Sequence, residues 1–298
     1  MQNKIPEIYL SSTCFNESNL LELCKMLVSN GLDKLELSGN LNHIDQRQLL
    51  EIFNKYNNKI DFNIHNYFPA PKIPFVLNLA HPETVDISIK HCMKAIDLCS
   101  YLGKSHYSLH AGVSFNPDPK DLGYDQYQLP SININESRKI LFDASVQISK
   151  YGRDKNIILL LENNVVTKAN CSDIENNRYH LSELNEFSYL LPIFNNNDVG
   201  ILIDTGHLNV SAQTFNYDPI IMTNKFNPYI KVAQLSENDG TADQNLPILE
   251  DSWFWDHIQW ERLDYISLEV TGQSIETLRN QIELTKRKVN KYFEKKNI

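Results

Sequence analysis

The sequence predicts an α/β fold, a single (β/α)8 barrel of parallel strands that takes up the whole chain, residues 1–298. Eight short β-rich runs alternate with about as many helical patterns, which is the order expected of a parallel sheet. Several runs are almost entirely apolar, as at 157–161 and 199–203, which is typical of strands covered on both faces. The 298 residues allow about 37 for each βα unit, and a barrel needs about 250 in total.

The predicted strands are short runs rich in leucine, β-branched and aromatic residues. In chain order they are Glu7–Thr13, Lys34–Ser38, Ile60–His65, His106–His110, Ile157–Glu162, Val199–Asp204, Ile230–Leu235 and Tyr265–Val270.

Helices are predicted between the strands from the spacing of apolar residues and from capping residues. Gly31 is a suitable stop for the first helix, Asp45 a suitable N-cap for the second, and Pro192 a stop for the fifth. The predicted helices are Glu17–Asn30, Asp45–Tyr56, Pro82–Leu102, Glu136–Tyr151, His180–Leu191, Pro219–Phe226, Trp253–Trp260 and Ser274–Glu294.

Long loops follow several strands, whereas the connections that precede strands are short. In a barrel, functional residues gather at the C-terminal rim, where the loops after the strands lie, so this asymmetry predicts a site there. An open doubly wound sheet is the alternative fold, but no G-x-G-x-x-G follows any strand, so a dinucleotide-binding fold has no support. The long loops are 66–82, 111–131, 163–179 and 236–252.

Aromatic residues in these rim loops predict apolar walls on which a sugar ring could stack. Packing within the loops, or a contact between the subunits of a homodimer, is the other interpretation. The residues are Tyr67, Phe68, Phe115, Tyr124, Tyr127, Trp253 and Trp255.

Composition argues against nucleic acid and membrane partners. The formal net charge is −9, and the only concentrated basic run is 286–296 in the last predicted helix, so a phosphate-binding face is not expected. No run approaches the roughly 20 apolar residues of a membrane span, and residues 1–15 lack the apolar core of a signal peptide. Five cysteines without a C-x-x-C pair suit a reducing compartment, so a cytoplasmic location is expected.

Six consecutive predicted strands, the third to the eighth, end in side chains that can bind a metal or donate hydrogen bonds. Each side chain alone has a structural interpretation, as a helix N-cap or a hydrogen-bonded polar group. Three carboxylates directed at one rim repel one another unless a cation neutralises them, so their convergence predicts a metal site. The strand-end residues are His65, His110, Glu162, Asp204, Gln234 and Glu269.

The predicted metal ligands are Glu162, Asp204, Glu269 and the amide oxygen of Gln234. This set contains only oxygen donors, which favours Mn²⁺ or Mg²⁺, while Co²⁺ and Zn²⁺ remain compatible with it. Four protein ligands leave open positions for two oxygens of a substrate.

Several short motifs, taken in order, resemble one known family over nearly the whole chain. They are Ser108-Leu-His-Ala-Gly112, Leu161-Glu-Asn-Asn164, Ile203-Asp-Thr-Gly-His207, Leu235-Ser-Glu-Asn-Asp-Gly240 with Asp243, and Ser267-Leu-Glu-Val270. With these motifs the chain resembles the xylose isomerase-like TIM barrel superfamily, in particular its sugar phosphate isomerase/epimerase branch, which is related to AP endonuclease family 2.

The resemblance implies roles for the strand-end residues. It places the metal on Glu162, Asp204, position 234 and Glu269, in agreement with the donor set above. The residues that it implies for substrate binding are His65, His110 and His207, to which Asn164 and Glu237 of the same motifs are added.

Three positions depart from the family pattern. Gln234 and Asn245 stand where histidines are common, and Ala242 stands where many members have an arginine. Gln234 predicts a metal site that binds more weakly and prefers hard, oxygen-binding cations. Ala242 removes an anion contact that a phosphorylated substrate would use. Together they also allow a member that has changed its reaction or lost it.

The resulting hypothesis is a metal-dependent isomerase or epimerase acting on a small sugar or keto-polyol. Glu162 and Glu269 would take and return the proton through an enediolate. Three alternatives stay open: a keto-polyol dehydratase on the same site, a non-catalytic sugar-binding barrel, and a zinc-dependent AP endonuclease of the endonuclease IV type.

Overall fold

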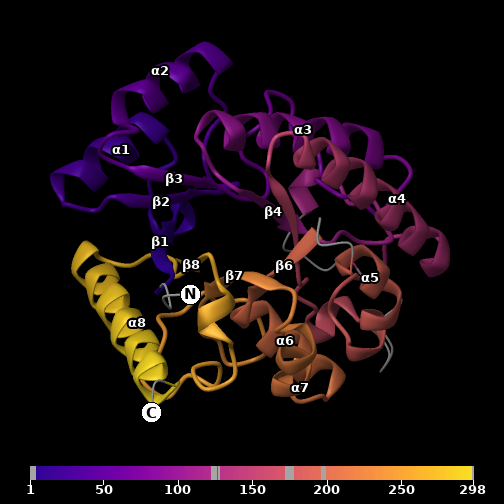
Figure 1. Ribbon diagram of the computed structural model, residues 1–298. Helices are drawn as coiled ribbons and strands as arrows, with labels where there is room; N and C mark the ends of the chain where they lie inside the picture. The colour runs from indigo at the N-terminus through magenta and orange to yellow at the C-terminus, as the bar shows by residue number, and fades with distance from the viewer. Residues whose placement is uncertain (1–4, 122–125, 127, 172–177, 196–198, 297–298) are drawn as a thin grey trace.

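The computed structural model describes residues 5–121, 126, 128–171, 178–195 and 199–296, and it confirms the barrel (Figure 1). All strand pairs are parallel, in the order β3-β2-β1-β8-β7-β6-β5-β4. The strands are β1 Glu7–Ser11, β2 Lys34–Leu37, β3 Asp61–Ile64, β4 His106–His110, β5 Ile158–Glu162, β6 Val199–Asp204, β7 Ile230–Leu235 and β8 Tyr265–Leu268.

The barrel closes between β3 and β4 through a short contact. His65 and Ser108 form an isolated parallel bridge, and the backbone N–H of Asn66 donates to the Ser108 carbonyl at 2.6 Å. The ring of strands is therefore joined at the point where the sheet order begins and ends.

Helices cover the outside of the ring, and the last of them packs against the first strand (Figure 1). The predicted N-cap of the second helix is confirmed, because the Asp45 side chain accepts from the Gln48 N–H; the first helix begins later than predicted, where the Asn19 side chain accepts from the Leu21 and Glu22 N–H groups. The helices are α1 Leu20–Ser29, α2 Gln46–Tyr56, α3 Val85–Tyr101, α4 Ile134–Arg153, α5 Phe187–Phe194, α6 Thr205–Phe215, α7 Pro219–Phe226 and α8 Ile275–Lys296.

Alternation of side chains along the strands determines what faces the barrel interior. One buried layer inside the barrel consists of Tyr9, Leu160, Leu202, Val232 and Tyr265. The intervening residues, such as Leu159 and Leu161, belong to the large core under the helices. Glu162, Asp204 and Gln234 lie two positions beyond members of the interior layer, so the same alternation directs them inward at the C-terminal ends of β5, β6 and β7.

Two of the helix predictions were wrong. The segment Trp253–Trp260 forms turns and leads only to a 3-10 turn at Trp260–Arg262, because its indoles are held by the Leu249 and Trp255 carbonyls. The fifth helix is Phe187–Phe194 instead of His180–Leu191. Pro192 lies inside its last turn, where its missing N–H costs a single helical hydrogen bond.

Helix α6 was not predicted at all. Its sequence begins Thr-Gly-His and contains Asn, Val and Ser, all of low helix propensity. The Asp204 side chain caps it by accepting from the His207 N–H at 2.7 Å, and most of the helix is buried. Capping and burial therefore outweigh the weak local propensity. Over the described residues, no helix is long and apolar enough to cross a membrane.

Candidate active site

A cavity of about 470 Å³ opens at the C-terminal ends of the strands, where the sequence predicted the site. Its lining comes from several strand ends and from the loops after β3, β4, β5 and β7. The predicted residues that line it are His65, His110, Glu162, Asn164, His207 and Glu269. Asp204 and Gln234 are also fully buried at strand ends but do not line the cavity.

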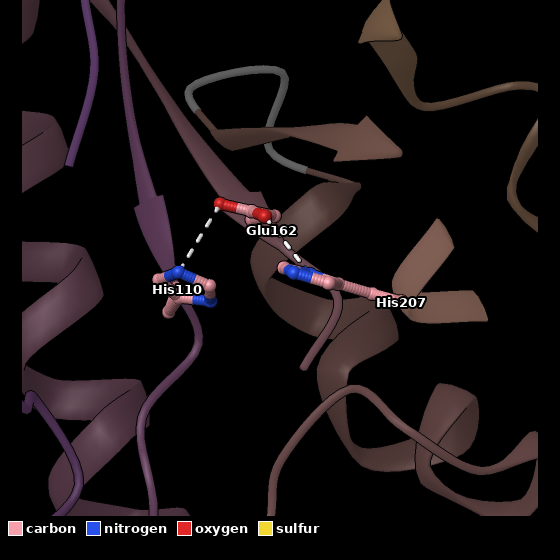
Figure 2. A group of neighbouring side chains, drawn as sticks. All are labelled: His110, Glu162 and His207. Atoms are coloured by element: carbon pink, nitrogen blue, oxygen red, sulfur yellow. Dashed lines mark ion pairs between the residues drawn. The ribbon is translucent and has the colours of Figure 1, made fainter. Parts of the chain in front are cut away.

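Glu162 is the centre of the polar cluster. His110 and His207 approach its carboxylate from different elements, as Figure 2 shows. The shortest distances are 3.8 Å from His110 Nε2, 3.4 Å from His65 Nε2 and 3.1 Å from His207 Nδ1. Burial alone would raise the pKa of Glu162, but these histidines lower it to about 2.

His207 is held between acceptors on both ring nitrogens. Its Nδ1 lies 3.0 Å from the Asn163 carbonyl as well as near Glu162, and its Nε2 lies 3.4 Å from Asp243 Oδ2. Burial opposes the charged form, but the charges of Asp204 and Asp243 raise the pKa of His207 well above its usual value. An imidazolium with both nitrogens protonated donates hydrogen bonds and cannot bind a metal.

Some buried oxygens of the cluster have no hydrogen-bond partner among the described residues. They are Oδ2 of Asp204 and Oε1 of Gln234, while the oxygens of Glu162 are met only by the histidine ion pairs described above. Burial, with the charges of Glu162 and Asp243, raises the pKa of Asp204 to about 7 although His207 opposes the change. Buried polar groups without partners are rare, and carboxylates of this kind are suited to a bound cation.

Glu269 adds a third carboxylate. Its Oε1 accepts a hydrogen bond from the Thr13 hydroxyl at 2.9 Å. Burial and the charges of Asp204 and Glu162 raise the pKa of Glu269 well above its usual value. The three predicted carboxylates therefore act on one another electrostatically, as expected for side chains that share one site.

A second donor set is also present. The ligand atoms of His110, Glu162 and His207 lie within 4.8 Å of one another, a spacing that a metal ion could bridge. Two nitrogens in the set would favour zinc more than the oxygen-only set does. His207 is engaged through both nitrogens, however, which leaves the predicted oxygen-only set as the metal site to be tested, although its carboxylates are not gathered as closely.

The other predicted substrate residues differ in position. Asn164 lines the cavity, but its amide donates to the carbonyls of Gly112 and His180, which holds the surrounding loops together. Glu237 is half-buried outside the cavity, and its backbone pairs with that of Leu246. The substrate roles of both residues stay predictions.

Sequence reasoning left some lining residues out of the site. Asp243 is the main one, although it belongs to a motif quoted above and contacts His207. The rings of Tyr67 and Phe75, which also line the cavity, pack against each other with centroids 5.4 Å apart. The backbone N–H of Phe75 donates to the Tyr67 hydroxyl. Nothing in the spacing of Phe75 marks it as a site residue, because its position depends on how the loop after β3 folds back.

Of the predicted aromatic wall residues that the structure describes, only Tyr67 lines the cavity. Phe68, Phe115 and Trp255 are buried in the protein core. Trp253 packs against the core and does not line the cavity. The predicted wall residues Tyr124 and Tyr127 lie outside the residues that the structure describes.

No lysine or arginine lines the cavity within the described part of the chain. Arg178 lies in the neighbouring loop, but its guanidinium donates to the carbonyls of Gln126 and Leu129 and stacks on Phe115. The described lining of the cavity therefore offers histidine as its source of positive charge, without lysine or arginine.

Comparison with known sequences gives one family. A family model described as a xylose isomerase-like TIM barrel matches residues 24–281. No curated protein matches the chain significantly.

Comparison with solved structures gives the same fold at low identity. A D-tagatose 3-epimerase-like protein is 17% identical with a TM-score of 0.69, over 97% of this chain and 99% of that one. The 3-keto-D-glucoside 4-epimerase of E. coli is 11% identical with a TM-score of 0.65, over 95% and 98% of the two chains. A Thermus thermophilus protein soaked with zinc chloride is 16% identical with a TM-score of 0.58, over 94% and 98%.

Proposed function

Since the chain belongs to the xylose isomerase-like TIM barrel family, we propose that it is a metal-dependent isomerase or epimerase of a small uncharged sugar. The observation that carries this proposal is a set of buried, unpartnered oxygens beside a cavity at the C-terminal rim. Two of the similar structures are a sugar epimerase and an epimerase-like protein, which is consistent with this class of reaction.

The metal would be held by Glu162, Asp204, Gln234 and Glu269. Three carboxylates and one amide oxygen are hard donors, so Mn²⁺ or Mg²⁺ is the expected ion. When bound, such an ion polarises a substrate carbonyl and makes the neighbouring C–H more acidic.

Glu162 and Glu269 are the proposed catalytic pair. Both line the cavity, and they come from β5 and from the end of β8. One carboxylate removes the proton from the carbon next to the carbonyl, and the other returns a proton. Return to the opposite face of the same carbon gives an epimer, and return to the adjacent carbonyl carbon, with the hydroxyl proton passing to the former carbonyl oxygen, gives the aldose–ketose isomer.

The histidines are proposed to orient the sugar. His65 Nδ1 is bonded to the Ser108 hydroxyl at 2.9 Å, which leaves Nε2 directed toward Glu162. The rings of His110 and His207 are stacked with centroids 5.4 Å apart, so both histidines can contact the same face of a bound sugar. As a buried imidazolium, His207 can donate to a substrate hydroxyl or to the Glu162 carboxylate.

The lack of lysine and arginine in the described lining argues for an uncharged substrate, since the His207 imidazolium of that lining is already paired with Glu162 and Asp243. A phosphate group carries about −1.5 to −2 charge and is normally met by Arg, Lys or a helix N-terminus. In this cavity it would meet Glu162, Asp243 and Glu269. The same surroundings, with the net charge of −9, disfavour the endonuclease alternative. A cytoplasmic location and a homodimer remain part of the proposal, as predicted from the sequence.

Proton exchange tests the proposal and separates its alternatives. Bound metal would first be removed from the protein with a chelator, which gives the chelated protein. This protein would be reloaded with Mn²⁺ and incubated with ketopentoses and ketohexoses in D₂O, and the products would be followed by NMR. We expect deuterium to enter next to the carbonyl of one ketose, together with formation of an epimer or isomer. Loss of water from the sugar would instead identify a dehydratase.

Matched variants make the outcome decisive. Glu162→Gln and Glu269→Gln should each abolish exchange, whereas Glu276→Gln, in the first turn of α8 and outside the cavity, should retain it. Tight binding of a sugar without exchange or turnover would establish the non-catalytic alternative and refute the proposal.

A further inference from the structure

Glu36 is a buried carboxylate that the mechanism above does not use. It lies in the middle of β2 and is completely inaccessible to solvent. Its neighbours Leu35 and Leu37 belong to the core under the helices, so alternation directs Glu36 into the barrel interior. No ion pair to Glu36 is present among the described residues. Burying a carboxylate without a cation is costly, so its position calls for an explanation.

Two hydrogen bonds reach Glu36 from strands on the other side of β1. The Gln234 side-chain NH₂ on β7 donates to Oε1 at 2.9 Å, and the Tyr265 hydroxyl on β8 donates to Oε2 at 2.8 Å. Both Glu36 oxygens accept here, and the NH₂ group is the end of the Gln234 amide that can donate. Glu36 therefore determines which end of the Gln234 amide faces it: the NH₂ group points to Glu36 and the carbonyl oxygen points away.

The carbonyl oxygen of the Gln234 amide, which points away from Glu36, is the atom that would bind a metal. Gln234 is fully buried, and its Oε1 has no hydrogen-bond partner among the described residues. In the sheet Gln234 pairs with Asp204 on β6, so the two side chains lie on the same face of adjacent strands. Asp204 Oδ2 likewise has no partner in the described part of the chain. The two unpartnered oxygens thus belong to side chains on the same face of adjacent strands, at the predicted metal site.

We propose that Glu36 is a positioning residue for the metal site: it orients Gln234 so that the amide oxygen serves as a metal ligand. This inference rests on the proposed function. A hydrogen bond from the amide NH₂ to a carboxylate also draws electron density toward the amide oxygen, which makes this oxygen a stronger metal ligand. Partners of this kind behind metal ligands commonly change metal affinity by about 10- to 100-fold.

A double-mutant cycle on metal binding tests the inference without any substrate. Mn²⁺ alone would be titrated into the chelated protein, and free Mn²⁺ followed by electron paramagnetic resonance. The variants are Glu36→Gln, Gln234→Met and the double variant. The amide introduced by Glu36→Gln can donate as well as accept, so the amide of Gln234 loses its fixed orientation. We expect Glu36→Gln to weaken Mn²⁺ binding about 10-fold or more, with little further effect in the Gln234→Met background.

Tyr265→Phe is the matched control. It removes the other partner of Glu36 but leaves the contact with Gln234, so Mn²⁺ affinity should change by no more than about threefold. If Glu36→Gln leaves the affinity unchanged, or weakens it equally with and without the Gln234 amide, the positioning role is refuted. In the second case Glu36 would act only through its charge.

Failure of the metal site itself gives a different result. If Gln234→Met leaves Mn²⁺ binding intact, the proposed ligand set is wrong regardless of Glu36. Should Glu36→Gln not fold, Gln234→His replaces it. An imidazole can donate one ring N–H to Glu36 and offer its other nitrogen to the metal, so preference should shift toward Zn²⁺ over Mn²⁺ by about 10-fold. An unchanged Zn²⁺/Mn²⁺ ratio would count against both the ligand and its orientation.

Discussion

Asp204→Asn is expected to make the metal-free protein more stable while weakening its metal site. Asp204 is fully buried, and its Oδ2 has no hydrogen-bond partner among the described residues. The asparagine oxygen can still accept from the His207 N–H, as Asp204 Oδ1 does now, so the cap of α6 survives. Only the charge is removed.

The magnitude follows from the pKa of Asp204, which is raised from 3.8 to about 7, first by burial. A folded-state pKa above the unfolded value means that stability is fully present below pH 3.8 and is lost as the pH rises through 7. The difference between these pKa values corresponds to a loss of up to about 4 kcal/mol above pH 7. For a chain of this size that is roughly 6 °C in Tm.

The assay is urea unfolding of chelated protein at pH 5 and pH 8. Asp204→Asn should exceed the wild type at pH 8 and lose the fall in stability between the two pH values. Asp243→Asn is the control with the opposite expected effect, a less stable protein at pH 8. The Asp243 carboxylate lies 3.4 Å from His207 Nε2, and that histidine lowers the pKa of Asp243 against the effect of burial. A metal-free Asp204→Asn protein that is less stable than wild type at pH 8 would refute the reasoning.

Three further predictions concern the surroundings of the cavity. Burial lowers the pKa of His91 to about 4, so the wild type should lose up to about 3 kcal/mol as the pH falls from 6.5 to 4, and His91→Phe should lose less in the same urea assay. Gly112→Ala should lower the free energy of unfolding by about 2 kcal/mol or more in the urea assay, because φ is +88° and the new Cβ would lie 2.6 Å from the Asn78 amide oxygen. Gly272→Ala is the control: its φ is +68° but the new Cβ would enter open space, so it should cost only about 1 kcal/mol. In competition assays, free sugars should displace a bound ketose, and their phosphate esters should not; tighter binding of the esters would show that a cation reaches the cavity.

Most of the fold follows from the sequence because the signals are local. Apolar runs such as 199–203 predict strands buried on both faces, and every predicted strand is present within two residues of its expected ends. Helix α6 could not be predicted from propensity, because its stability comes from the Asp204 cap and from burial. The false helix at Trp253–Trp260 shows the converse, since its indole contacts are set by tertiary packing.

The site was predicted where strand alternation alone determines direction. Glu162 and His207 come together because β5 and α6 both begin or end at the C-terminal rim. Asp243 and Phe75 lie on loops, whose paths depend on contacts far along the chain. Glu36 had a local signal, as a carboxylate between Leu35 and Leu37, but its partner lies 198 residues away in the sequence.

Metal titration of the chelated protein tests the central claim most directly. The account predicts about one equivalent of Mn²⁺ per chain by isothermal titration calorimetry, with binding lost in Glu162→Gln and Glu269→Gln. The absence of binding in the wild type, or binding that survives both substitutions, would contradict a metal-dependent isomerase at this site. Binding of about three zinc ions would instead favour the endonuclease alternative.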